Sequence, residues 1–262
     1  MRVVAVDPDV IVVISAIWRT TCTAVRAGDE GFVIDSPVLP DELDALPGVL
    51  EQSGFPASGL LCTHGDWDHL LGRLAFPAVS LGVAESTAAR LDAAPGEAQR
   101  SLRDFDDEHY VKRERPLALA GIQALPVPGR LSLGALDSAE LELYPATGHT
   151  ADGVAYWLGQ KQVLVCGDYL SPVEIPMISA GGSLDAYLET LSRLAPLVEQ
   201  AAHVIPGHGG PITGTEAARI VTEDVAYLDA LRAHGADARL PEARRTAAQK
   251  QIHAANAARS QS

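Results

Sequence analysis

The sequence predicts an α/β fold in which two mixed β-sheets form a sandwich flanked by helices, an αββα arrangement. Two blocks of short apolar segments, residues 1–35 and 117–158, are separated by Gly, Pro and Asp turns and indicate strands. Segments with apolar residues at helical spacing follow these blocks, as expected for helices that cover a sheet. A chain of 262 residues suits one large domain of this kind, which we assign to residues 1–235.

The first block predicts four consecutive strands, separated by Asp-Pro and Gly-Asp turns. These strands are expected at residues 3–6, 10–18, 21–26 and 31–35. A helix is expected to begin at Pro40, with Pro47-Gly48 interrupting its pattern. Residues 59–62 and 79–83 are then predicted to form strands, and residues 85–91 a helix.

Two further helices are predicted after the second block. Ser183 can cap the first, which carries leucines at helical spacing. Thr215 can cap the second, and Gly235 is placed to end it. The segment beyond, residues 236–262, is rich in Ala, Gln and Arg and has few large apolar residues. We expect this C-terminal tail to be either a frayed helix or disordered.

The charge balance narrows the class of partner. With 34 acidic and 20 basic residues the net charge is −14, whereas nucleic-acid binding requires a basic surface, so a nucleic-acid partner is disfavoured. The apolar run at residues 10–17 is too short to cross a bilayer, and acidic residues interrupt the N-terminus before a signal peptide forms. Cys22, Cys62 and Cys166 form no Cys-x-x-Cys pair and fit buried thiols in a reducing compartment. We therefore expect a cytoplasmic protein that acts on a small molecule and has no membrane partner.

Four side chains able to bind a metal fall within six residues, directly after the apolar run 59–62. They are His64, Asp66, Asp68 and His69. Three more candidates each follow an apolar run and stand beside a glycine, where a strand ends and the backbone turns: His149, Asp168 and His208. Carboxylates packed this closely repel one another unless a cation binds them. The alternative for the first cluster, taken alone, is a polar loop with two surface histidines.

In order and spacing, these seven residues resemble the metallo-β-lactamase superfamily, whose signature is His-x-His-x-Asp-His followed by a Gly-His, a Gly-Asp and a late Gly-His. The match extends from residues 33–35 to residues 206–209, with one departure, since Asp66 stands where the family usually has its second histidine. The resemblance implies a site for two divalent metal ions, zinc foremost, with manganese or iron as alternatives. It implies a first ion at His64, Asp66 and His149, a second at Asp68, His69 and His208, and Asp168 as the bridge.

The aspartate at position 66 leaves two interpretations open. As a ligand, the Asp66 carboxylate is anionic and hard, so it adds a negative charge and moves the metal preference from zinc toward manganese or iron. The bridging water is then less acidic. In the other interpretation the side chain of Asp66 is too short to reach an ion, which leaves the first site weak or empty.

Several other residues have weaker signals. By resemblance to some lactonases of the family, Tyr169 would donate a hydrogen bond to the oxyanion, and a buried supporting role is the alternative. Asp35 would support the metal ligands, Trp67 is expected to pack against the sheet rather than stack on substrate, and Asp152-Gly153 is predicted to be a plain turn. Four histidines are expected to lie outside the metal site: His109, His203, His234 and His253.

Residues 92–116 form the least family-like stretch. Acidic residues are followed by basic ones, with Phe105 and Tyr110 among them. One interpretation is a solvated helix and loop. The other is a lid over the metals that contributes substrate contacts.

The ligand set and the resemblance together predict a metal-dependent hydrolase that uses metal-activated hydroxide on a small ester, thioester or lactone. Asp68, Asp168 and Tyr169 are the expected catalytic residues. A true β-lactamase is less favoured, because those enzymes are usually exported and no signal peptide is expected here. Two alternatives stay open: an iron-dependent redox enzyme of the same fold, similar to the family dioxygenases, and a non-catalytic ligand-binding relative whose altered site holds metal poorly.

Overall fold

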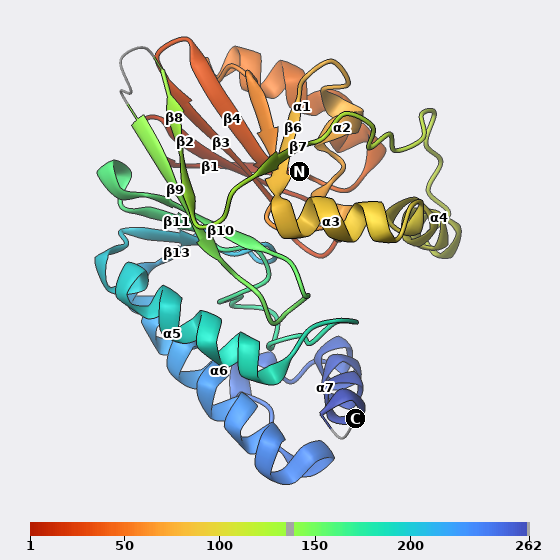
Figure 1. The fold of residues 1–262 in the computed structure, drawn as a ribbon, viewed down its shortest axis with the longest axis vertical. Coiled ribbons are helices and arrows are strands. Elements are labelled where there is room, and N and C mark those ends of the chain that lie inside the picture. Colours follow the sequence, from red (N-terminus) through yellow and green to blue (C-terminus); the bar gives the residue numbers. More distant parts are fainter. Residues whose placement is uncertain (135–138, 261–262) are drawn as a thin grey trace.

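The structure, a computed structural model, describes residues 1–134 and 139–260. Two β-sheets pack face to face, and helices cover the outer face of each (Figure 1). The sheets come from consecutive parts of the chain, β1 to β7 in the first and β8 to β13 in the second. The predicted αββα sandwich is confirmed.

The first sheet runs in chain order. Its strands are β1 (Arg2–Asp7), β2 (Val10–Ile14), β3 (Thr21–Ala27), β4 (Glu30–Asp35), β5 (Gly59–Leu61), β6 (Leu81–Ala84) and β7 (Gln123–Leu125). Strands β1 to β4 pair antiparallel, and β4 to β7 pair parallel. Parallel neighbours need crossover connections. These contain the helices α1 (Pro40–Gln52), α2 (Gly72–Ala75), α3 (Glu85–Ala93) and α4 (Glu97–Glu108).

The second sheet has the spatial order β13-β12-β11-β10-β9-β8. Its strands are β8 (Gly129–Leu133), β9 (Ala139–Pro145), β10 (Val154–Leu158), β11 (Val163–Val165), β12 (His203–Ile205) and β13 (Ile212–Thr213). Strands β11 and β12 pair parallel, and α5 (Leu184–Gln200) connects them. Helix α6 (Gly214–His234) packs beside α5 on the outer face. Within the described ranges, no helix is both long and apolar enough to cross a membrane.

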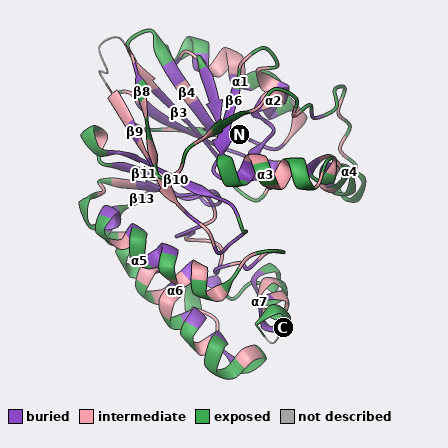
Figure 2. Cartoon of the chain, in the orientation of Figure 1, coloured by how far each residue is buried: buried purple, intermediate pink, exposed green. Residues whose placement is uncertain are grey.

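Strand β2 shows how the sandwich is filled. All five of its residues are buried, because both faces of the sheet are covered. Val10, Val12 and Ile14 point into the core between the sheets. Ile11 and Val13 belong to the core on the helical side, since successive side chains of a strand alternate between its faces. Figure 2 shows the buried residues concentrated along the strands, with exposed residues on the outer helices.

Several predicted boundaries shift by one or two residues, and two elements differ more. Strand β2 ends at Ile14 instead of continuing to residue 18, because the backbone turns through positive φ at Trp18 and Arg19. Helix α1 continues through Pro47, because the buried residues Leu46 and Leu50 hold both of its turns against the sheet.

The helix caps were predicted with mixed success. Ser183 caps α5, and its hydroxyl accepts a hydrogen bond from the amide of Ala186, as expected. The cap of α6 is Thr213 rather than Thr215, because the Thr213 hydroxyl accepts the amide proton of Glu216. Gly235 ends α6 in a positive-φ conformation.

The C-terminal segment 236–262 contains helix α7 (Ala247–Arg259), capped by the Thr246 hydroxyl. Two buried amide side chains of α7 bind the backbone of the loop before α5. Gln249 accepts from the amide of Ile175 at 2.7 Å, and Asn256 accepts from the amide of Ile178 at 2.8 Å. The C-terminal helix therefore holds the loop that passes beside the candidate site.

Candidate metal centre

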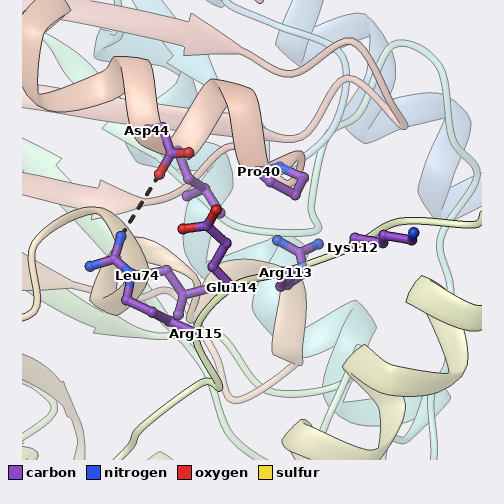
Figure 3. Close-up of a pocket in the computed structure, with 8 residues that line it drawn as sticks. Pro40, Asp44, Leu74, Lys112, Arg113, Glu114 and Arg115 are labelled. Atoms are coloured by element: carbon purple, nitrogen blue, oxygen red, sulfur yellow. Dashed lines mark ion pairs between the residues drawn. The ribbon is translucent and has the colours of Figure 1, made fainter.

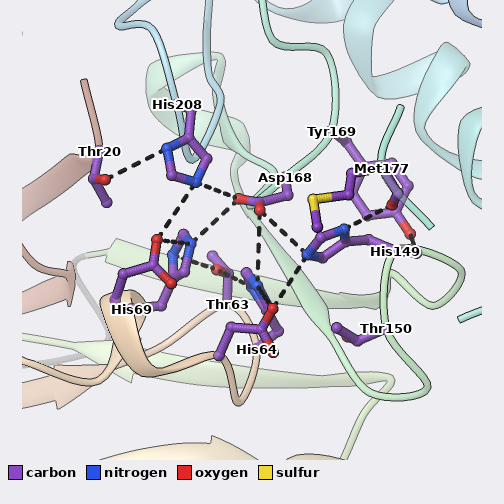
Figure 4. A network of polar contacts seen from close by, with 12 residues as sticks. Thr20, Thr63, His64, His69, His149, Thr150, Asp168, Tyr169, Met177 and His208 are labelled. Carbon is purple, nitrogen blue, oxygen red and sulfur yellow. Dashed lines mark hydrogen bonds and ion pairs between the residues drawn. The ribbon is translucent and has the colours of Figure 1, made fainter. Parts of the chain in front are cut away.

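The seven predicted donors meet at one edge of the sandwich. His64, Asp66, Asp68 and His69 lie in the loop and 3-10 turn that follow β5 of the first sheet. The other three come from the second sheet: His149 lies between β9 and β10, Asp168 follows β11, and His208 follows β12. Strand ends in both sheets therefore aim the donors at a shared centre (Figure 4).

Four of these side chains form a first donor group, namely His64, Asp66, His149 and Asp168. Nε2 of His149 lies 3.5 Å from Oδ2 of Asp66 and 3.2 Å from Oδ2 of Asp168. Nε2 of His64 lies 3.7 Å and 3.9 Å from the same two oxygens. Donors at about 2.0–2.2 Å from one ion in tetrahedral geometry are roughly 3.3–3.6 Å apart. The separations of 3.2–3.9 Å lie close to this spacing, so the group suits one cation, with Oδ2 of Asp66 facing the two imidazoles.

A second donor group contains Asp68, His69, His208 and again Asp168. Nε2 of His69 lies 3.7 Å from Oδ2 of Asp68 and 3.3 Å from Oδ1 of Asp168. Nε2 of His208 lies 3.6 Å and 3.5 Å from these oxygens. Asp168 thus turns one carboxylate oxygen to each group, which is the geometry of a bridging ligand.

The outer nitrogen of each histidine in the two groups contacts a group that can accept its proton. The Nδ1 atoms lie 3.1 Å from Thr63 Oγ1 for His64, 3.0 Å from Asp35 Oδ2 for His69, 2.8 Å from the Met177 carbonyl for His149 and 3.3 Å from the Trp18 carbonyl for His208. A proton held on Nδ1 leaves the lone pair of Nε2 free to bind a metal. Each of these four imidazole rings is therefore oriented with Nε2 available for a metal.

Polar atoms left without partners support the same conclusion. Within the described residues, Nε2 of His64, His69 and His149 and Oδ1 of Asp168 are buried and have no hydrogen-bond partner. Burying such atoms unsatisfied costs free energy, and a cation at each centre would satisfy them. The donor set of imidazoles and carboxylates suits zinc, manganese and iron alike.

The carboxylates around the histidines also create a negative local charge that favours binding of a cation. Burial is the strongest single effect and acts to lower the pKa of His149 and of His208, but the surrounding carboxylates, Asp168 foremost, together outweigh it. The result is a pKa of about 9 for His149 and about 10 for His208 without a metal. A bound ion would supply this positive charge in place of protons, so metal binding should compete with protonation.

Backbone and buried side chains hold Asp168 in its bridging position. The Tyr187 hydroxyl of α5 donates to the Asp168 carbonyl at 2.9 Å. Gly207 passes so close that a Cβ atom there would collide with Oδ1 of Asp168, so only glycine fits. Sequence reasoning identified the Gly-His pair but missed Tyr187, because that tyrosine lies on the apolar face of a helix.

Asp35, at the end of β4, supports the motif loop as expected. Its Oδ1 accepts from the amide of Thr63 at 2.8 Å, and its Oδ2 accepts from the Thr63 hydroxyl at 2.9 Å. The same Oδ2 lies 3.0 Å from Nδ1 of His69. Asp35 has φ of 58°, a conformation in which aspartate is tolerated better than most residues.

Asp152 is more than the plain turn that was predicted. Its carboxylate is buried and accepts from the Gly65 amide at 2.8 Å and from the Thr87 hydroxyl at 2.7 Å. Arg90 of α3 donates to it at 2.8 Å and also to Oδ1 of Asp66 at 2.6 Å. Burial acts to raise the pKa of Asp152, and the ion pair with Arg90 outweighs it, so the pKa is lowered. Arg90 was missed because its partners lie far away in the sequence.

Tyr169 does not have the geometry expected of an oxyanion donor. Its side chain is buried, and its hydroxyl donates to the Thr147 carbonyl at 2.8 Å while accepting from the His149 amide at 3.0 Å. The single hydroxyl proton is therefore engaged within the protein. This geometry supports the alternative, in which Tyr169 fixes the loop that carries His149.

Trp67 packs against the core on the helical side of the first sheet and contacts aromatic residues of other segments. Its ring lies 4.8 Å from that of Phe105 in α4 and 5.6 Å from that of Trp18. His109 stacks on Phe105 at 4.3 Å and contacts no donor. His253, also predicted to lie outside the site, binds the Tyr227 hydroxyl at 3.0 Å.

Residues 92–116 line two separate cavities. Glu97, Ala98 and Ser101 of α4 form one wall of a cavity of about 250 Å³ that also borders Asp66 and Arg90. Residues 112–115 line another, of about 160 Å³, against α1 (Figure 3). No metal donor lines the second cavity, so it is the α4 side of this stretch that meets the candidate site.

A matched pair of substitutions tests the lid interpretation. Phe105→Leu should destabilise the fold by about 1–2 kcal/mol, because a buried ring that supports Trp67 is lost. It should also raise KM at unchanged metal content, because Trp67 borders the cavity beside Asp66. Tyr110→Ala should alter neither, because Tyr110 is 92% exposed. Urea unfolding measures the stability, metal analysis the metal content, and steady-state kinetics the KM. An unchanged KM in Phe105→Leu would contradict the lid interpretation of residues 92–116.

Comparisons with known proteins agree with the observed fold. The family model of the metallo-β-lactamase superfamily matches residues 17–208. A metallo-β-lactamase family protein from Thermus thermophilus is 22% identical, with 98% of this chain and 95% of that chain covered and a TM-score of 0.69. The sec-alkylsulfatase Pisa1 from Pseudomonas sp. is 14% identical, with 97% and 49% covered and a TM-score of 0.73. The protein TTHA1623, solved in a di-iron-bound form, is 21% identical, with 79% and 96% covered and a TM-score of 0.62. At these identities the structural likeness establishes the fold.

Proposed function

The chain belongs to the metallo-β-lactamase superfamily, and we propose that within it this protein is a dinuclear metal-dependent hydrolase of a small ester, thioester or lactone. The observation that carries the proposal is the placement of Asp168, with one carboxylate oxygen facing each of two complete donor groups. A metal ion that only stabilises the fold needs a single site in which protein ligands fill every coordination position. Two adjoining groups that share a carboxylate are typical of centres that activate water.

The residues of this chain would hold the metals as follows. His64, Asp66 and His149 would hold the first ion, and Asp68, His69 and His208 the second, with Asp168 between them. Two divalent ions held by these residues would supply an activated hydroxide and polarise the substrate oxygen. Zinc is our first choice, with manganese or iron as alternatives, since the TTHA1623 structure holds two irons in the same fold.

The exposure of the donors supports a proposed position for the substrate. The Asp66 side chain is 26% exposed, against 13% for Asp168 and 10% for Asp68. Asp66 also borders the cavity of about 250 Å³ between α3 and α4, which is smaller than the sites that take drug-sized ligands. We therefore place a small substrate in this cavity, with its reacting carbonyl directed past Asp66 toward Asp168.

The residues around the centre would orient the donors. The Nδ1 contacts of the histidines fix the imidazole rings, and Tyr169 fixes the loop that carries His149. The carboxylate of Asp168 faces both donor groups, and that of Asp68 belongs to the second group. They are suited to accept a proton from that water or to return one to the leaving group.

A panel assay with metal control tests the proposal. Protein purified without added metal should contain about two zinc or manganese ions per chain, as two-metal hydrolytic centres do, and should hydrolyse at least one member of a panel of esters, thioesters, lactones and β-lactams. A chelator should abolish that activity, and returned zinc or manganese should restore it. Two tightly held irons with no hydrolysis would favour the iron-dependent redox alternative, and a chain free of metal would favour a binding relative.

A further inference from the structure

We propose that Arg90 positions Asp66 as a metal ligand and offsets part of its charge, so that an aspartate–arginine pair takes the place of the histidine at this position of the family signature. The inference rests on the dinuclear site proposed above but not on the identity of the substrate. It assigns a role to Arg90 of α3, which is neither a histidine nor an aspartate, the two residue types of the family signature.

The two oxygens of the Asp66 carboxylate have different partners. Oδ1 lies 2.6 Å from Nη2 of Arg90. Oδ2 faces the first donor group, at 3.5 Å from Nε2 of His149 and 3.7 Å from Nε2 of His64. Because one oxygen is held by the guanidinium, the carboxylate is presented to the metal through a single oxygen, as an imidazole presents a single nitrogen.

The guanidinium is itself fixed in place. Its Nη1 donates at 2.8 Å to Oδ1 of Asp152, a residue with only 1% of its surface exposed. Asp152 is anchored in turn by the Thr87 hydroxyl, one helical turn before Arg90, and by the amide of Gly65. Gly65 lies between the donors His64 and Asp66, so its hydrogen bond to Asp152 fixes the metal-binding loop between these two donors. Arginine suits the task because its planar fork can bind two carboxylates at once.

The charge of Arg90 changes the balance expected from the sequence alone. Asp66, Asp68 and Asp168 bring three negative charges to two divalent ions, one more than the usual signature. Arg90 contacts Asp66 directly and brings a positive charge beside the first donor group, although it shares that charge with Asp152. The pair therefore offsets part of the negative charge of Asp66, so the shift of metal preference away from zinc should be smaller than the sequence alone predicts.

Metal titration of Arg90 variants tests this role without using catalysis. Zn²⁺ is titrated into metal-free protein in competition with a chromophoric chelator, and the stoichiometry and both affinities are measured. Arg90→Met should weaken the first of the two sites by about tenfold to a hundredfold and leave the second within error. Arg90→Lys, which keeps the charge without the fork, should fall between Arg90→Met and the unchanged protein. Arg73→Met is the control, because Arg73 is a half-buried arginine that binds only backbone carbonyls away from the donors.

A double-mutant cycle separates positioning of Asp66 from general support of the loop. In an Asp66→His background, Arg90→Met should change the first-site affinity by less than about threefold, because the carboxylate that needs Arg90 is gone. An equal loss in both backgrounds, or no loss in the Asp66 protein, would overturn the proposal. Should Arg90→Met fail to fold, Arg90→Lys in the two backgrounds makes the same comparison.

The outcome for this inference is distinct from the outcome for the proposed function. A protein that binds no metal would overturn both. A first site whose affinity depends on Arg90, in a protein that hydrolyses no substrate, would overturn only the proposed function.

Discussion

Asp168→Ala is expected to release both metal ions and to reduce hydrolysis by at least about a thousandfold. Each donor group contains one oxygen of this carboxylate, so a single substitution removes a ligand from both. The loss should appear in metal content as well as in kcat/KM. Asp168→Asn, which keeps an oxygen but loses the charge, should retain more metal than Asp168→Ala and less activity than the unchanged protein.

Tyr169→Phe is the matched control for this experiment. The tyrosine is adjacent to Asp168 in sequence, but its hydroxyl contacts the backbone of Thr147 and His149. Its activity should stay within about tenfold of the unchanged protein, with two metals bound. Full metal content and full activity in Asp168→Ala would refute the bridging assignment, and a greater loss in Tyr169→Phe would restore the oxyanion role.

Arg244→Met is expected to lower the free energy of unfolding by about 3–5 kcal/mol, the cost of breaking a buried ion pair. Arg244 is 1% exposed, and its Nη1 lies 2.7 Å from Oδ1 of Asp224, which is also 1% exposed. Burial already raises the pKa of Asp224 to about 7 against the effect of Arg244. Without the arginine, that carboxyl would have to take up a proton or stay charged in the core.

Urea unfolding of Arg244→Met beside Arg245→Met measures this effect. Arg245 is the neighbouring exposed arginine, whose hydrogen bond goes to the Leu240 carbonyl, and its replacement should cost within about 0.5 kcal/mol. Arg244 also donates to the Glu174 carbonyl at 2.7 Å, in the loop that contains Met177. The Met177 carbonyl lies 2.8 Å from Nδ1 of His149. First-site metal affinity should therefore fall in Arg244→Met as well. Equal midpoints for the two variants would contradict the expected contribution of the buried pair.

The seven donors could be predicted because they lie in local patterns. Four fall within six residues directly after an apolar run, and in the other three a strand ends, a glycine lets the chain turn and the donor follows, as at Gly167-Asp168 and Gly207-His208. Such a pattern needs no knowledge of the rest of the fold. The covered sheets could be predicted for the same reason, since runs such as β2 are apolar on both faces.

The supporting residues could not be predicted, because their contacts join segments that only the packed sheets bring together. Arg90 and Asp152 are 62 residues apart and come from the two different halves of the sandwich. Tyr169 carries the donor expected from the resemblance, yet the backbone of residues 147–149 engages its hydroxyl proton. Local rules were also ambiguous where two candidates stood close together, as with Thr213 and Thr215 at the start of α6.

The division of the donors between the two sheets has a consequence for folding. Each donor group takes two side chains from the loop after β5 and two from the second sheet, counting Asp168 in both. With ions bound, coordination joins the two halves of the chain as a non-covalent cross-link. A ligand that binds only the folded state adds about 2.7 kcal/mol at a free concentration one hundred times its Kd. Neither half can then separate without releasing both ions, so metal supply in the cell would set how often the sandwich opens and how long the chain survives proteolysis.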